Sequence, residues 1–155
     1  MDKENQSKEN LINWTINELE KYQDEKRVKL ASGYYPTSMK VIGVNSPNIK
    51  IVLKELREKL KELNLPAKDI IVLAKALVNT NTFECQQMAY SLLDKEKKSQ
   101  VALTKQDIRD LGKTLDNWAS VDSYSVLIYG YAWRTGIITM EDVKQLQQYS
   151  HLHIC

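Results

Sequence analysis

Apolar residues recur at intervals of three and four along most of the chain, with polar residues between them. That spacing gathers apolar side chains on one face of an α-helix, whereas a half-buried strand alternates them at every second residue. Glycine and proline, which interrupt regular structure, number only five and three. The pattern therefore predicts an all-α chain.

The first predicted helix covers about residues 9–31 and is followed by a loop-like segment. Two glycines and two prolines punctuate that segment: Gly33, Pro36, Gly43 and Pro47. Ser46 followed by Pro47 predicts an N-cap and a first helical residue, because the missing N–H of proline costs nothing in a first turn. The second helix should end before Pro66, since the residue before proline resists helical angles.

The later apolar stripes predict five more helices: about 67–79, one after Thr82, one after Thr104, about 115–134, and a short one from Thr139. Thr104 and Asp107 have the spacing of a capping box, in which side chain and backbone bond each other across the first turn. Asp142 stands at the same distance after Thr139. Gly136 stands where a helix ends in the left-handed conformation.

The chain of 155 residues fits one domain, 1–155, with 1–8 expected to be disordered and 150–155 a tail. Predicted helices of roughly 12 to 20 residues, paired at a spacing of about 35 to 40, favour stacked antiparallel hairpins of the solenoid type. A helical bundle explains the same periodicity about as well. DKEKKSQ, residues 94–100, is interpreted as a charged connector.

Composition narrows the class of protein. Hydrophobic residues make up 43% and charged residues 27%, as in soluble globular domains, and the net charge of +2 does not by itself demand nucleic acid. The N-terminus is polar, and no run of about 18 apolar residues occurs, so we expect neither a secretion signal nor a membrane span, and a cytoplasmic location. Cys85 and Cys155 form no recognisable disulfide or zinc pattern.

Two short motifs are weak signals. Leu111-Gly112-Lys113-Thr114 contains the end of a phosphate-binding loop, but the glycine that should precede it is Asp107, and no strand is predicted before it. His151, His153 and Cys155 could hold a metal only with further ligands. We therefore expect no metal and no cofactor.

Basic residues gather between positions 95 and 113, where six stand against three acidic residues, a net +3: Lys95, Lys97, Lys98, Lys105, Arg109 and Lys113 against Glu96, Asp107 and Asp110. Beside helix N-termini such a patch would suit phosphate groups, because backbone N–H groups and the helix dipole both favour anions. A solvated face is the more common meaning of such a run.

Trp118 and Asp122 are four residues apart, so one helix would place an indole one turn from a carboxylate on the same face. A first-turn carboxylate favoured by the helix dipole and a core tryptophan explain the pair in the plainest way. A pair aimed into a binding groove is the functional alternative.

Three stretches together resemble the DNA alkylation repair glycosylase family, the AlkD-like proteins built from HEAT-like helical repeats. They are YYPTSMKVIGVNSPNIKIVLKEL (34–56), NTFECQQMAYSLLDK (81–95) and DNWASVDS (116–123), and in order they span roughly residues 30–140. The resemblance implies an all-α, HEAT-like solenoid of about six to seven helices in antiparallel pairs.

The resemblance also implies a function. Trp118 would be an aromatic wall and Asp122 the catalytic carboxylate of a monofunctional glycosylase that excises cationic N3- or N7-alkylated purines from duplex DNA. Lys105, Arg109 and Lys113 are the candidate phosphate contacts, and a monomer is expected. The family continues with repeats that supply a second aromatic wall and an arginine, and this chain ends before them. A non-catalytic helical module that binds DNA or a protein is the alternative.

Overall fold

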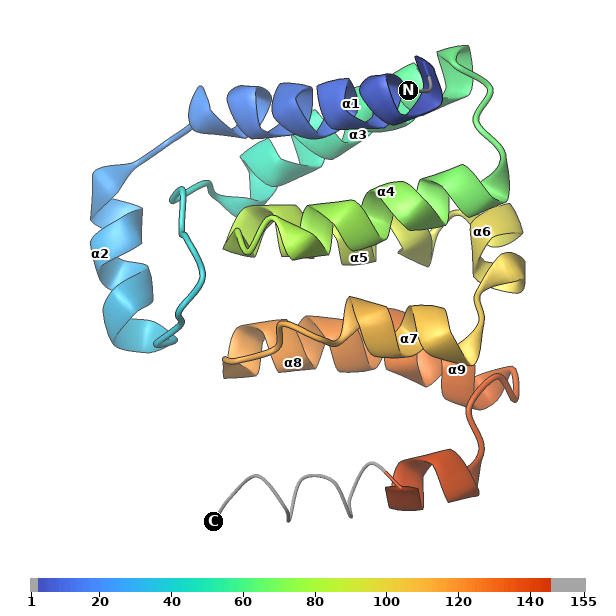
Figure 1. Ribbon diagram of the computed structural model, residues 1–155. Coiled ribbons are helices and arrows are strands. Elements are labelled where there is room, and N and C mark those ends of the chain that lie inside the picture. Colours follow the sequence, from blue (N-terminus) through green and yellow to red (C-terminus); the bar gives the residue numbers. More distant parts are fainter. Residues whose placement is uncertain (1–2, 146–155) are drawn as a thin grey trace.

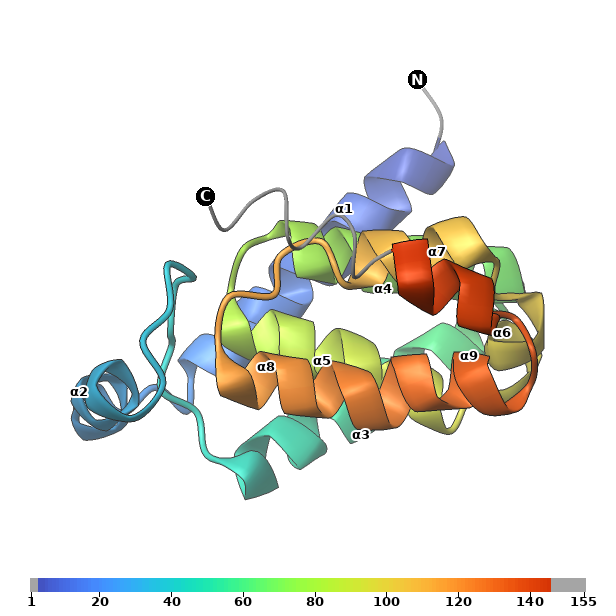
Figure 2. The same ribbon diagram turned by 90° about the horizontal axis from the view of Figure 1, so that it is seen from below.

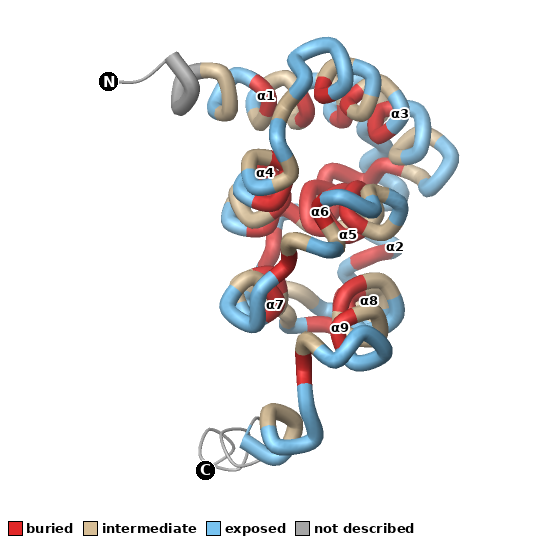
Figure 3. The backbone as a smooth tube through the Cα atoms, turned by 90° about the vertical axis from the view of Figure 1, so that its right-hand side faces the viewer, coloured by how far each residue is buried: buried red, intermediate tan, exposed pale blue. Residues whose placement is uncertain are grey.

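The computed structural model describes residues 3–145 of the chain, and the side chains of residues 7–145. Its helices stack in two layers, with α1, α4 and α7 in one layer and α3, α5 and the α8–α9 helix in the other (Figures 2 and 3). Within the described residues there is no β-strand. The prediction of an all-α, helical-repeat fold is thus confirmed.

The helices occupy the following ranges: α1 Lys3–Glu20, α2 Glu25–Tyr34, α3 Ser46–Glu62, α4 Ala67–Asn79, α5 Phe83–Asp94, α6 Lys97–Ala102, α7 Lys105–Leu111, α8 Trp118–Tyr124 and α9 Gly130–Arg134. A π-helical turn, Ser125–Tyr129, joins α8 to α9 without a break, and residues 140–145 are helical. Figure 1 shows α2 standing apart from the stack, beside the ends at which α5 and α8 begin. No helix in the described part of the chain is long and apolar enough to cross a membrane.

The prediction of a single helix over about 9–31 is wrong, because two helices, α1 and α2, cover that range. α1 begins at Lys3, so residues 3–8, expected to be disordered, are helical, and it ends at Glu20. Asp24 then caps α2 by accepting the backbone N–H of Lys26 at 2.9 Å. The backbone N–H of Asp24 donates to the carbonyl of Gly43 at 3.1 Å, a partner too distant in sequence for the apolar pattern to reveal.

The charged connector predicted at 94–100 contains the start of α6. Glu96 is the N-cap of this helix, and its carboxylate accepts the backbone N–H of Ser99 at 2.6 Å. At α3 the cap lies one residue earlier than predicted: Asn45 accepts the backbone N–H of Asn48, and Ser46 is the first helical residue. The division of 9–31 into α1 and α2 and the additional helix α6 raise the number of helices in the described residues above the expected six to seven.

Three local predictions are confirmed. Thr104 and Asp107 form both halves of the capping box at α7. Asp142 accepts the backbone N–H of Thr139 at 2.8 Å, which fixes the start of the helical residues 140–145. Gly136 has a φ of +78°, as its predicted place after a helix requires. Signals that depend on a few neighbouring residues therefore held.

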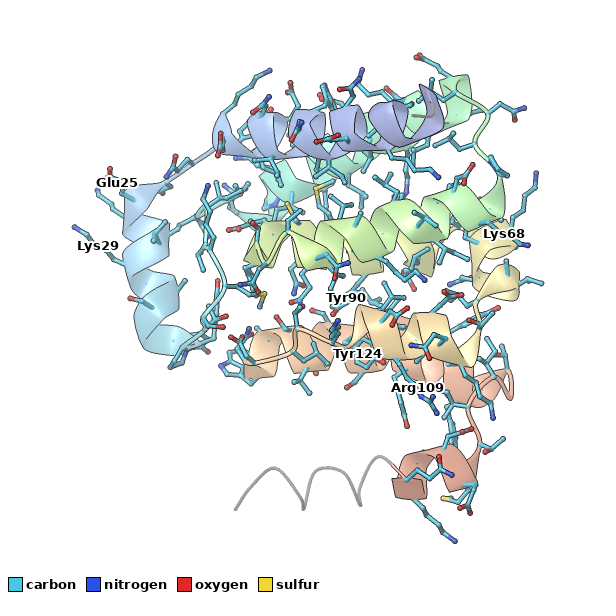
Figure 4. The ribbon with its side chains drawn as sticks, in the orientation of Figure 1. Glu25, Lys29, Lys68, Tyr90, Arg109 and Tyr124 are labelled. Atoms are coloured by element: carbon cyan, nitrogen blue, oxygen red, sulfur yellow. The ribbon has the colours of Figure 1, made fainter. Side chains whose placement is uncertain are left out.

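The core is thickest around α4 and α5, the central pair of the stack. Helix α4 contacts α1, α5, α6 and α7, so its apolar side chains are covered on nearly all sides. Two tyrosines, labelled in Figure 4, bond α7 to its neighbours α5 and α8. Tyr90 donates its hydroxyl to the carbonyl of Leu111, and Tyr124 to that of Ile108, both at 2.7 Å. The first bond gives the Leu111 carbonyl at the end of α7 a donor, and the second adds a donor to the Ile108 carbonyl, which also accepts the backbone N–H of Gly112 at 3.3 Å.

Gly112 lies against Tyr124 so closely that no side chain fits. A Cβ added there would lie 2.9 Å from both Cζ and Oη of Tyr124. We expect Gly112→Ala to lower the free energy of unfolding by about 1–3 kcal/mol, because the tyrosine must shift from its bond to Ile108. Urea unfolding followed by circular dichroism measures the change.

Gly33→Ala in α2 is the matched control. A Cβ at Gly33 meets nothing within 4 Å, so this substitution should be neutral or stabilise the helix by up to about 1 kcal/mol. Equal stability of the two alanine variants would contradict the close contact at Gly112.

Candidate functional site

Helix α8 is oriented by its polar first turn. Asn117 caps it by accepting the backbone N–H of Ser120 at 2.9 Å, and its own amide donates to the Ser120 hydroxyl at 3.0 Å. Ser120 and Tyr124 are buried and face the neighbouring helices. Positions 118 and 122 each lie two residues from one of these, so they point the other way. Trp118 is accordingly 56% exposed, and Asp122 is exposed as well.

Trp118 is held in place although much of its surface is exposed. Its indole Nε1 donates to the backbone carbonyl of Tyr34 at 3.0 Å, and its ring meets the rings of Tyr34 and Tyr35 edge-on, with centroids 5.4 and 6.4 Å apart. Tyr35 stacks on Phe83 at 4.8 Å. These four side chains, here called the aromatic cluster, come from the end of α2, the start of α5 and the start of α8.

Asp122 is not engaged by the rest of the chain. Within the described residues no hydrogen bond or ion pair joins its carboxylate to another residue. The π-helical turn begins three residues later, and the backbone N–H of Gly130 bonds the carbonyl of Ser125, five residues back. Turns of this kind inside helices are frequent at functional sites. The structure thus places Trp118 and Asp122 together on one exposed face, as their spacing predicted.

Asp116, which the sequence analysis did not single out, connects the loop after α2 to the start of α8. Its carboxylate accepts hydrogen bonds from the Thr37 hydroxyl at 2.6 Å and from the Ser38 backbone N–H and hydroxyl, both at 2.7 Å. Asn117 donates a further bond at 2.9 Å. Partial burial would raise the pKa of Asp116, but these hydrogen bonds outweigh it and hold the pKa well below its usual range.

Glu84, in the first turn of α5, holds the backbone of residues 42–44 between α2 and α3. Its buried carboxylate, 1% exposed, accepts the backbone N–H groups of Ile42, Gly43 and Val44 at 3.0, 2.8 and 3.3 Å. Gly43 has a φ of +88°, and an added Cβ would lie 2.4 Å from the carbonyl oxygen of Asp24, so only glycine fits. A cavity of about 170 Å³ remains between this segment and α2, beside Tyr34 and Tyr35.

The predicted phosphate-binding residues lie elsewhere. Lys105 and Arg109 belong to α7, in the layer opposite α8, and line a cavity of about 250 Å³ together with Tyr124 and Asp142 (Figures 2 and 4). Lys105 is also ion-paired with Asp142 at 3.0 Å. Lys113 is exposed in the turn after α7. The structure does not bring these three residues to Trp118 and Asp122, and their contact with DNA stays a prediction.

The other sequence motifs form no phosphate-binding, thiol or metal site within the described residues. Gly112-Lys113-Thr114 follows the C-terminal end of α7, whereas a phosphate-binding loop must precede a helix N-terminus. Burial raises the pKa of the Cys85 thiol to about 11, so it stays protonated. Within the described residues no group of three possible metal ligands gathers, and His151, His153 and Cys155 lie outside them.

Asp116 should make stability depend on pH. The carboxylate is stabilising above its unfolded pKa of about 3.9, and that contribution is lost as the pH falls toward the lower folded pKa. We expect the parent protein to be more stable than Asp116→Asn by about 1 kcal/mol near pH 6, and the difference to shrink below about pH 4. Urea unfolding of both proteins at about pH 6 and about pH 3 measures it.

Asp122→Asn serves as the control for that series, since it removes the same charge from a carboxylate with no bonds. Its stability should match the parent at both pH values. A constant difference between Asp116→Asn and the parent across the range would mean that the bonds to Thr37 and Ser38 do not depend on the charge of Asp116.

One family model matches the chain. Residues 15–146 match the family model described as DNA alkylation repair enzyme, a range that includes the whole aromatic cluster, Asp116 and Asp122. No curated protein and no solved structure is significantly similar to the chain. The family match covers most of the chain and confirms the resemblance noted in the sequence. DNA alkylation repair is therefore the general function, and the chain belongs to the family of DNA alkylation repair enzymes.

Proposed function

We propose that the protein is a monofunctional DNA glycosylase, which excises cationic N3- or N7-alkylated purines by hydrolysis, with Asp122 as its catalytic carboxylate. One observation carries the proposal: Asp122 is exposed and unengaged, one helical turn from an exposed tryptophan whose position is fixed. The proposed substrate is duplex DNA carrying such lesions, bound by a monomer in the cytoplasm.

The chemistry needs a negative charge more than an acid. A purine alkylated at a ring nitrogen is already cationic, so it leaves as a neutral base without being protonated first. The sugar becomes positive in the transition state. A carboxylate about 4 Å from that charge contributes a gross Coulomb energy of about 4 kcal/mol at an effective dielectric constant near 20. The same carboxylate can orient the attacking water.

Trp118 is proposed to contact the same sugar. The negative face of an indole attracts a cation, so the ring supports the charge that Asp122 stabilises. Its bond to the Tyr34 carbonyl and its contacts with Tyr34 and Tyr35 supply a ring that is already oriented before DNA arrives. Little side-chain entropy is then lost on binding.

Lys105, Arg109 and Lys113 keep the proposed role of phosphate contacts. Arg109 and Lys113 are both exposed and have no ion pair within the described residues, so both are available. Lys105 would have to share or release Asp142. In this proposal the three residues add affinity without sequence preference, as phosphate contacts do.

Incubation with methylated duplex DNA tests the function. A glycosylase releases free alkylated purines, which chromatography detects, and leaves abasic sites that alkali converts to strand breaks. The alternative, a non-catalytic module, binds the same DNA with salt-dependent affinity and produces no abasic sites. A folded sample that binds and releases nothing would replace the first proposal by the second.

A further inference from the structure

The fold divides the basic run found between residues 95 and 113. Its first part lies where α3 and α5 end and where α4 and α6 begin, at the end of the stack away from the start of α8 (Figure 1). A cavity of about 360 Å³ opens there. Four basic side chains line it: Arg57, Lys61, Lys95 and Lys98. We call this cavity the junction pocket.

The charge of the junction pocket is not balanced by the chain. Within the described residues none of the four basic side chains has an ion pair. Glu96 is the acidic residue of the lining, and its carboxylate is already bonded to the Ser99 backbone N–H at 2.6 Å. Because four positive charges repel one another, an anion in the pocket relieves that repulsion.

The chemistry of the lining selects the kind of anion. Arg57 is fixed, since its Nη2 donates to the Ser91 carbonyl at 2.6 Å, and a guanidinium has further donors in the same plane. Lysines add mobile charges around it. Leu60 and Leu92, both nearly fully buried, also line the pocket, and Arg57 is half-buried, whereas the three lysines are exposed. A guanidinium fork matches carboxylate and phosphate oxygens alike, and the several cations around it favour phosphate, which offers more acceptor oxygens and can carry more charge.

We propose that the junction pocket binds a phosphate group. The phosphate could belong to the DNA backbone, as a second anchor away from the aromatic cluster, or to a small molecule. Both sources present tetrahedral phosphate oxygens to Arg57 and the lysines, as a monoanion in the DNA backbone and as a monoanion or dianion in a small molecule. Phosphate binding in the junction pocket is independent of base excision, so the experiment measures only binding.

The first arm of the test uses inorganic phosphate. Amide chemical shifts of the parent protein, followed by NMR during a phosphate titration, should move for Lys95 and its neighbours and for the end of α3. Lys95→Gln together with Lys98→Gln should weaken that binding roughly tenfold. Lys26→Gln together with Lys29→Gln is the control, because both lysines are exposed on α2 and the charge change is the same (Figure 4 labels Lys29).

The second arm uses unmodified duplex DNA between about 50 and 200 mM salt. If the phosphate is that of DNA, the Lys95 and Lys98 double variant should reduce the slope of log affinity against log salt by about 1 to 2. Loss of inorganic phosphate binding with an unchanged DNA slope would assign the pocket to a small molecule, which also supports the proposal. No localised phosphate shifts, or equal effects of the pocket and control variants on phosphate binding, would overturn it.

Discussion

Replacing Asp122 by asparagine lowers the rate of purine excision by roughly 10²–10³-fold, provided that excision is the reaction. The amide keeps the shape of the side chain but removes the negative charge that opposes the positive sugar. Stability should not change, because the Asp122 carboxylate is exposed and has no hydrogen bond or ion pair within the described residues. The measurement is single-turnover release of alkylated purine from methylated duplex DNA, together with a urea unfolding curve.

Glu141→Gln is the matched control for Asp122→Asn, since it removes one negative charge from an exposed position outside the site. It should leave the excision rate within about twofold of the parent. If Asp122→Asn excised as fast as Glu141→Gln, the carboxylate would have no catalytic role, and the binding of DNA would have to be explained without it.

Glu84→Ala should lower the free energy of unfolding by about 3 kcal/mol. The substitution leaves the backbone N–H groups of Ile42, Gly43 and Val44 without their acceptor inside the protein. Relief from burying a carboxylate offsets part of the cost. For a domain of this size the melting temperature should fall by roughly 6–12 °C, which differential scanning calorimetry measures.

Two further variants separate the hydrogen bonds from the charge at this position. Glu84→Gln keeps one acceptor oxygen, so its melting temperature should lie between those of the parent and Glu84→Ala. Glu58→Ala changes an exposed glutamate of α3 and should cost less than about 0.5 kcal/mol. A melting temperature of Glu84→Ala close to that of Glu58→Ala would contradict the role of Glu84 in holding the backbone of residues 42–44.

The features that the sequence predicted correctly are those written in nearby residues. The capping box of Thr104 and Asp107 spans four residues, and the facing of Trp118 and Asp122 follows from helical geometry alone. The helix over 67–79 is set by its own apolar stripe and by Pro66. No knowledge of the rest of the chain was needed for these, which is why they held.

The start of α6 and the Asn45 cap of α3 were missed although their bonds are local, but other missed features depend on distant partners. The break before α2 involves the bond from Asp24 to Gly43, and the role of Asp116 depends on Thr37, which is 79 residues away. The basic run between 95 and 113 is continuous in sequence but crosses α6, a turn and α7. The structure therefore sends Lys95 and Arg109 to different cavities. No local pattern reports such separations.

The bonds between Asp116 and the Thr37–Ser38 pair also bear on the order in which the molecule forms. They join residues 78 and 79 apart, whereas paired helices such as α4 and α5 are neighbours along the chain. Contacts of large sequence separation close late, because a long loop must lose its freedom before they form. During synthesis on the ribosome, the helices up to α5 can therefore pack while Trp118 has still to emerge. The aromatic cluster can then be completed only after α8 has been added to the helices that precede it.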